Sequence, residues 1–199
     1  MKGMLLAACG LGAALLLAGP LAMAEALAYR LDPVHSRILF RVDHNGFSRA
    51  MGTFSRPQGV LFFDPEDWTT ARLDVRVDLA TLDLGDEGFN ARILAPAWLD
   101  AGAFPEARFV SERVEPIDEN RARVHGTLRL RGVQAPLTLE VRLNRLARTP
   151  YNAMRRTAGF SAVATLSRAA FGLRASRRAV GDAVRLEIEV EAIRTRDAQ

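Results

Sequence analysis

Residues 121–143 alternate apolar and polar side chains on both sides of one short break, and this pattern constrains the fold more than any other feature of the chain. A period of two residues is that of a β-strand with one face hidden from water. The segment therefore predicts two antiparallel strands joined through residues 132–136. The residues expected on the hidden face are Ala122, Val124, Gly126, Leu128 and Leu130, then Leu137, Leu139, Val141 and Leu143.

Other parts of the chain repeat this alternation. With the hairpin, they make roughly eight antiparallel strands separated by turn signals such as Asn45-Gly46. Eight is the number of strands that closes a small barrel, so we expect an all-β fold with a roughly eight-stranded antiparallel barrel. The expected strands outside the hairpin are residues 37–43, 51–64, 72–79, 107–116, 157–167 and 184–192.

One segment, residues 85–105, has apolar residues at helical spacing instead. Pro96 divides it into two short turns, because proline interrupts a helix. We interpret the segment as a short helical insertion that forms a lid or plug. The alternative is that it covers an open barrel end as ordinary core.

The first residues have the pattern of a secretory signal peptide: Lys2, an apolar run over residues 4–18, and a small-x-small cleavage site at residues 22–24. The run is shorter than the roughly 20 residues that a membrane span needs. We therefore expect cleavage after Ala24, which removes residues 1–24 and leaves residues 25–199 as a single domain without a stable membrane span. Cys9, the only cysteine, leaves with the signal, so no disulfide is expected.

The net charge of the chain is +4, and it falls to +3 when Lys2 is removed with a leader that has no acidic residue. Arginines alternate with acidic residues, as over residues 72–78, and make no patch of one sign. We expect no nucleic-acid partner. A homodimer is compatible with the sequence.

The chain has three histidines, His35, His44 and His125. No pair of them has the spacing of metal ligands, and in a continuous strand His35 and His44 point to opposite faces. Residues 85–88 lack the lysine of a phosphate-binding loop, and no acid–base pair of carboxylates stands out. We therefore expect no metal, no cofactor and no enzyme activity.

The interior of an eight-stranded barrel is either filled by its own side chains or wide enough for one small ligand. Several inward positions carry small residues, and such a wall either accommodates large residues opposite or leaves an apolar cavity. A cavity of this kind takes an elongated lipid, at about 0.8 kcal/mol per buried methylene. The expected lining is Ile38, Phe40, Val42, Phe62, Val75, Val77, Phe89, Ile93, Trp98, Leu128, Phe160, Ala162, Ala164, Leu186 and Ile188.

Contacts to a ligand head group are expected at the barrel mouth, from His44 at a strand end and from Asn90 and Arg92 in the helical segment. A turn histidine that bonds backbone is the alternative for His44. A rival function is an enzyme that acts on a bound lipid with His44 as general base, although Asp43 points the other way. A third is a packed interaction domain that holds an acidic partner on an arginine-rich surface.

The chain resembles the YceI-like family over nearly all of its mature length. No one motif is diagnostic, but their order and spacing together are specific. The motifs are YRLDPVHS at residues 29–36, HNG at 44–46, GTF at 52–54, LDLG at 82–85, Phe104-Pro105 with Phe109, HGTLRLRG at 125–132 with Pro136, and RAAFGL at 168–173.

The resemblance implies a lipocalin-like barrel in the bacterial periplasm whose interior accommodates polyisoprenoids or similar long-chain amphiphiles. The chain departs from the family where many members carry Arg-Asp and then His-Leu in the helical insertion, since it has Phe89-Asn90 and Arg92-Ile93 there. It also has Ala170 where they carry aspartate. We therefore expect a periplasmic lipid-binding protein, for transport or storage of a long-chain isoprenoid or similar amphiphile such as a quinone tail or polyprenyl carrier. Its ligand is expected to have a different head group, or a head group that the protein does not specifically recognise.

Overall fold

The computed structural model describes residues 26–195, which form ten β-strands, one α-helix and four short 3-10 helices. The signal peptide predicted at residues 1–24 lies outside the described residues. The strands are β1 (Leu27–Leu31), β2 (Arg37–His44), β3 (Ser48–Ser55), β4 (Gln58–Phe63), β5 (Arg72–Asp78), β6 (Glu106–Asp118), β7 (Arg121–Leu130), β8 (Val133–Arg148), β9 (Arg156–Ser167) and β10 (Val180–Arg194). The helices are α1 (Glu87–Leu94), η1 (Trp68–Thr70), η2 (Leu79–Thr81), η3 (Pro150–Asn152) and η4 (Ala169–Phe171).

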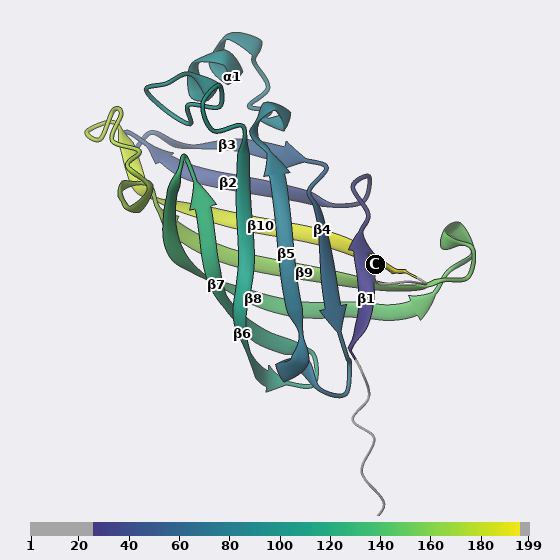
Figure 1. Cartoon of the computed structure of the whole chain (residues 1–199). Coiled ribbons are helices and arrows are strands. Elements are labelled where there is room, and N and C mark those ends of the chain that lie inside the picture. The colour runs from purple at the N-terminus through teal and green to yellow at the C-terminus, as the bar shows by residue number, and fades with distance from the viewer. Residues whose placement is uncertain (1–25, 196–199) are drawn as a thin grey trace, which may run out of the picture.

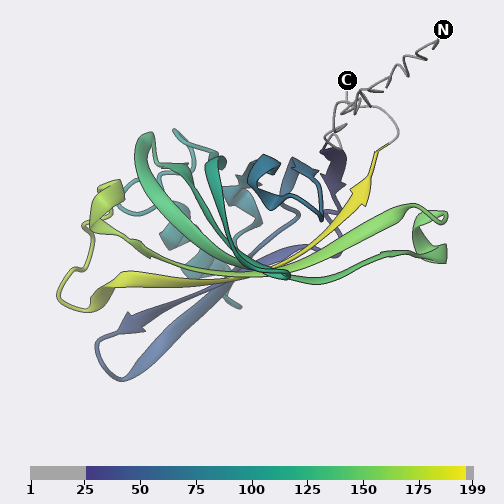
Figure 2. The same cartoon turned by 90° about the horizontal axis from the view of Figure 1, so that it is seen from below.

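Eight of these strands close into an antiparallel barrel (Figure 1, Figure 2). They pair in the order β1, β4, β5, β6, β7, β8, β9, β10, and β1 then pairs with β10. The closing pair is short, since only Tyr29, Arg30 and Leu31 face residues of β10. The expected eight-stranded barrel with a short helical insertion is confirmed.

Strands β2 and β3 lie outside the closed ring and extend its wall at one end. β2 pairs with the first part of β10, along the edge that β1 joins near the end of the same strand. β3 is the outer edge, and it contacts the ring again through a bridge between Thr53 and Asp83. Figure 1 shows α1 beside β3, at this end of the barrel.

Two strand predictions differ from the structure. Residues 51–64 were expected to form one strand, but the chain breaks between β3 and β4 at Arg56, which has a φ of +57°, and at Pro57. β1 was not predicted, because a strand of only five residues gives little periodic signal. The ring is completed by β1, which pairs with β4 on one side and with β10 on the other, while the strongly alternating β2 lies outside it.

The hairpin of β7 and β8 follows its sequence pattern closely. Ala122, Val124, Gly126, Leu128 and Leu130 are all buried, and the polar residues between them face outward. The turn between the strands has positive φ at both Arg131 and Gly132, as a type I′ turn requires. The predicted antiparallel pair with one hidden face is confirmed.

Aromatic side chains fill the end of the barrel opposite α1. The ring of Phe63 meets Trp68 at 5.1 Å and Phe160 at 5.4 Å, both edge to face, and Tyr29 packs against Phe63 at 6.4 Å. Edge-to-face contacts add about 0.5–1.5 kcal/mol to the burial of such rings. This end of the interior is therefore solid core.

Within residues 26–195, no helix combines the length and the apolar composition that crossing a membrane requires.

Candidate ligand-binding site

A cavity of about 320 Å³ lies in the half of the barrel that α1 covers. Its walls come from both sides of the fold: β2, β3 and β10 face β5, β6 and β7, while α1 and the turns after it form the cover. The volume is at the lower end of the range for ligand pockets, about 300–1,000 Å³. The lining side chains are predominantly aliphatic and aromatic, and they include no aspartate or glutamate.

Most of the residues expected to bind a ligand lie around this cavity. The apolar members of the group share inward positions on four strands or lie in the helical segment. His44 and Arg92 also border the cavity, and both are exposed. The expected apolar residues found in the lining are Ile38, Phe40, Val42, Val77, Phe89, Ile93, Trp98, Leu128 and Leu186.

The placement predicted for Phe62 is wrong. Its side chain lies on the outer face and is 37% exposed, whereas Phe63 is 1% exposed inside the barrel. The alternation was extended through residues 51–64 as one strand, but the break at Pro57 shifts the parity of β4 by one residue. A shift of one residue moves every side chain of a strand to the other face.

Five other expected lining residues lie outside the cavity, although they occupy inward positions. Phe160 belongs to the aromatic core, and Ala162 and Ala164 lie between it and Leu166, which does line the cavity. Ile188 pairs with Ala162. Val75 shares the inward face of Val77 but does not line the cavity. Large aromatic rings fill the end of the barrel opposite α1, and the cavity lies in the half that α1 covers.

The helical insertion covers the cavity as a lid. α1 begins after Asp86, whose Oδ1 accepts a hydrogen bond from the Phe89 N–H at 2.7 Å, and it ends before Pro96. Asn90 does not border the cavity, because its Oδ1 accepts from the Leu84 N–H at 2.8 Å and ties the helix to the preceding segment. Asn90 is therefore placed as a structural anchor of the lid.

Arg168 is a site residue that the sequence analysis missed. It borders the cavity with only 5% of its surface exposed, and its guanidinium donates to the carbonyl oxygens of Ala175 at 2.8 Å, Val180 at 3.0 Å and Gly181 at 3.2 Å. Desolvation lowers its pKa, and the nearby carboxylate of Asp182 opposes this shift. Because an arginine stays charged in proteins, a buried cation borders a space whose other lining residues are mostly apolar. The alternation of β9, continued by two residues beyond Leu166, predicts an inward side chain at Arg168.

Arg131, at the tip of the β7–β8 hairpin, contacts the lid segment. It is half-buried, and its Nη2 donates to the Pro96 carbonyl oxygen at 3.0 Å. The positive φ of Arg131 turns its side chain out of the strand parity and toward the lid segment. Arg131 therefore links the tip of the β7–β8 hairpin to the lid.

The remaining lining residues come mainly from elements whose long-range position the sequence could not show. β3 contributes Ala50 and Phe54, and the loop before β10 contributes residues that follow η4. Those not expected from the sequence are Ala50, Phe54, Leu79, Leu84, Leu99, Ala107, Leu130, Leu166, Arg168, Leu173, Ser176, Ala179, Val180 and Val184.

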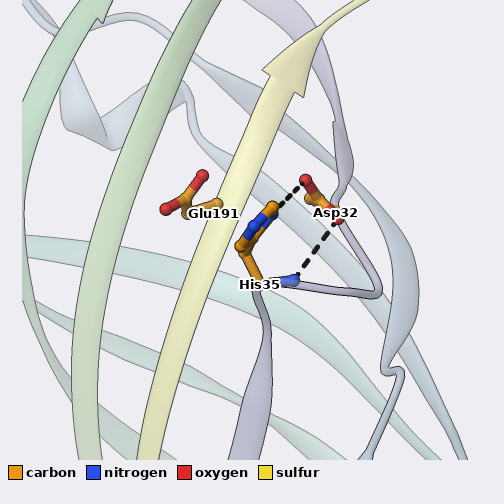
Figure 3. Close-up of side chains that lie close together, drawn as sticks. All are labelled: Asp32, His35 and Glu191. Carbon is orange, nitrogen blue, oxygen red and sulfur yellow. Dashed lines mark hydrogen bonds and ion pairs between the residues drawn. The ribbon is translucent and has the colours of Figure 1, made fainter. Parts of the chain in front are cut away.

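A second group of polar side chains gathers outside the cavity, where the turn between β1 and β2 meets β10 (Figure 3). It consists of Asp32, His35 and Glu191. Burial alone would raise the pKa of Asp32, but hydrogen bonds from His35 and Val34 outweigh it and lower the pKa. The same hydrogen bond to Asp32 raises the pKa of His35.

A family model described as the YceI-like domain matches residues 29–192. Curated relatives include a UPF0312 protein of Pseudomonas savastanoi pv. phaseolicola, which is 33% identical over 169 residues, covering 85% of this chain and 86% of the relative. A UPF0312 protein of Pseudomonas putida strain W619 is 32% identical over 190 residues, covering 94% of this chain and 96% of the relative.

Two solved structures have the same fold. BcnA of Burkholderia cenocepacia superimposes with a TM-score of 0.73 at 24% identity, covering 81% of this chain and 98% of that one. A polyisoprenoid binding domain from Saccharophagus degradans, implicated in plant cell wall breakdown, gives a TM-score of 0.67 at 16% identity, covering 85% of this chain and 99% of that one. The family model, the curated relatives and the closed barrel agree, and the chain belongs to the YceI-like family.

Proposed function

We propose that this protein is a binding protein that holds one long-chain isoprenoid, or a similar amphiphile, inside its barrel. The observation that carries the proposal is the cavity of about 320 Å³ beneath α1, with apolar walls and no carboxylate among its lining residues. Burial of a hydrocarbon chain there gains about 25 cal/mol for each Å² removed from water. A polyisoprenoid binding domain with this fold supports the choice of ligand class.

The polar side chains at the cavity favour an amphiphile over a simple hydrocarbon. Arg92 and His44 lie at the rim, and Arg168 reaches the cavity wall from within. The head group would therefore meet cations and an imidazole while the chain lies among apolar residues. We propose that Arg92 and His44 contact it directly.

Binding without chemical change is the simpler function for this site. A general base needs a partner that orients it, and the lining offers His44 no carboxylate. Asp43, its neighbour in sequence, accepts a hydrogen bond from the Gly46 N–H at 3.2 Å within the turn. We propose that the protein carries or stores its ligand in the periplasm after cleavage at Ala24.

The binding of a long-chain fluorescent fatty acid or prenyl probe tests this function. Ala50 borders the cavity on β3, so Ala50→Trp fills part of the space. Ala183 lies exposed on β10 and outside the cavity, so Ala183→Trp adds the same side chain elsewhere. We expect Ala50→Trp to lose most of the probe binding and Ala183→Trp to retain it, with circular dichroism unchanged in both. Equal binding by the two variants would contradict the proposal.

A further inference from the structure

Asp32, His35 and Glu191 bring one imidazole and two carboxylates together on the outside of the barrel (Figure 3). The His35 ring lies between the two carboxylates, and the three ligand atoms are all within 4.8 Å of one another. Nδ1 of His35 is 2.8 Å from Oδ2 of Asp32. None of the three residues lines the cavity, so the group is separate from the proposed lipid site.

Hydrogen bonds hold the β1–β2 turn, which carries Asp32 and His35, against β10, which carries Glu191. The Asp32 N–H donates to the Glu191 carbonyl oxygen at 2.8 Å. The Ser36 hydroxyl, on a residue only 1% exposed, accepts from the Glu191 N–H at 3.2 Å and approaches the Glu191 carbonyl oxygen at 3.4 Å. Segments more than 150 residues apart are thus fixed in register beside the three side chains.

The Glu191 carboxylate is available to an ion. Across residues 26–195 it makes no hydrogen bond and no ion pair, and one of its oxygens lies within 4.8 Å of the ligand atoms of Asp32 and His35. Asp32, by contrast, accepts hydrogen bonds from Val34 and His35. The Glu191 oxygens are not buried, so an ion can reach them from solvent.

We propose that Asp32, His35 and Glu191 form a binding site for a divalent transition-metal ion of the zinc class. Imidazole nitrogen and carboxylate oxygen are ligands that zinc accepts, and three protein ligands leave a fourth position for water. Ligand atoms of a tetrahedral zinc site are about 3.4 Å apart. Nδ1 of His35 and Oδ2 of Asp32, now 2.8 Å apart, therefore need to separate slightly, while the Glu191 oxygen, within 4.8 Å of them, needs to approach by about 1 Å. Side-chain rotation of Glu191 and of the exposed His35 can supply this movement.

Metal binding has a structural consequence at this place. The ion would join the β1–β2 turn to β10, beside the short β1–β10 pairing that closes the ring. His35 would bind through Nδ1 as a neutral imidazole, and any proton on that nitrogen would pass to solvent. The bound ion stabilises the folded barrel because the unfolded chain does not hold the three ligands together.

Calorimetric titration of the untagged protein with zinc chloride tests the site. We expect one saturable site per chain, weakened at least about tenfold in Glu191→Gln and in His35→Ala. His125→Ala is the matched control, because His125 also lies on the outer face beside a carboxylate, with Nε2 3.1 Å from Glu115, but outside the three-ligand group. The four proteins are identical at all other positions, so any zinc bound elsewhere is common to them.

Thermal unfolding provides a second readout that does not depend on the heat of binding. Zinc should raise the Tm of the wild type and of His125→Ala by several degrees and leave Glu191→Gln unchanged. Glu191→Gln keeps the contact between Asp32 and His35. A loss of metal binding in this variant would therefore not result from a disrupted β1–β2 turn. Equal zinc affinity in the wild type and Glu191→Gln, or no saturable binding to the wild type, would overturn the proposal whatever the lipid measurements show.

Discussion

The guanidinium carbon of Arg168 lies 5.1 Å from the centroid of the Trp98 ring. This contact joins the lid segment to the loop before β10, because the same guanidinium donates to the carbonyl oxygens of Ala175, Val180 and Gly181. One cation therefore holds two parts of the cavity wall together.

Replacement of Arg168 should destabilise the protein. Arg168→Ala removes the guanidinium that donates to three carbonyl oxygens, and it removes a side chain that is only 5% exposed, so we expect a loss of about 2–4 kcal/mol in the free energy of unfolding. Urea denaturation measures it. Arg174→Ala, at an exposed position in the same loop, should change stability by less than about 0.5 kcal/mol. Similar losses in the two variants would show that the three hydrogen bonds are not what stabilises this loop.

Gly126 should tolerate no side chain. A Cβ there would fall against the Val110 carbonyl oxygen and 2.6 Å from a ring carbon of Phe109, so Gly126→Ala should cost about 1–3 kcal/mol in chemical denaturation. Gly102 has open space around it. Gly102→Ala should leave stability unchanged or raise it by up to about 1 kcal/mol. The tight fit of β6 on β7 would be disproved by a Gly126→Ala variant as stable as the wild type.

Acid should weaken the contact between Asp74 and Arg108. The hydrogen bond from Arg108 lowers the pKa of Asp74 below its ordinary value of 3.8, against the opposing effect of burial. The resulting stability is present above the unfolded-state pKa and is lost as the pH falls through the lower folded-state pKa. Because both side chains are about 40% exposed, the contribution should not exceed about 1 kcal/mol.

Asp74→Asn should therefore be less stable than the wild type at pH 7, and the difference should shrink toward zero between pH 4 and pH 2. Urea denaturation across this range measures it. A difference that is the same at every pH would mean that the charge of Asp74 is not responsible.

Arg92 should distinguish between head groups. Arg92→Gln should weaken binding of farnesyl phosphate by about two- to fivefold, the range of a single exposed charge contact, and leave binding of farnesol unchanged. Competition against a fluorescent probe measures both affinities, and the phosphate effect should decrease at high salt. Arg129→Gln, on the outer face of β7, is the control and should change neither. If Arg92→Gln weakened the binding of farnesol and of farnesyl phosphate equally, Arg92 would act by maintaining the structure of the lid and not by contacting the head group.

The sequence predicted the parts of the fold that strong local alternation determines. The β7–β8 hairpin is the best example, since every second residue from Ala122 to Leu130 is buried. The prediction of strands failed where the alternation of apolar and polar residues was short or interrupted. β1 has only five residues, and the break at Pro57 changed the parity that had placed Phe62 inside.

The cavity lining was predictable only for residues whose inward position follows from the alternation of a single strand. Phe40 and Val42 follow from the alternation of β2, and both line the cavity. The space itself depends on where Phe63 and Trp68 fill the barrel, which no single strand reveals. The group of Asp32, His35 and Glu191 depends on a pairing between the two ends of the chain, so no local spacing indicated it.

Native mass spectrometry of the protein purified from its own host tests most directly whether the barrel holds a lipid. We predict a complex heavier than the protein by one long-chain molecule, which is released into an organic extract and is absent from Ala50→Trp. A ligand-free wild-type protein with no long-chain molecule in its extract would contradict the central claim.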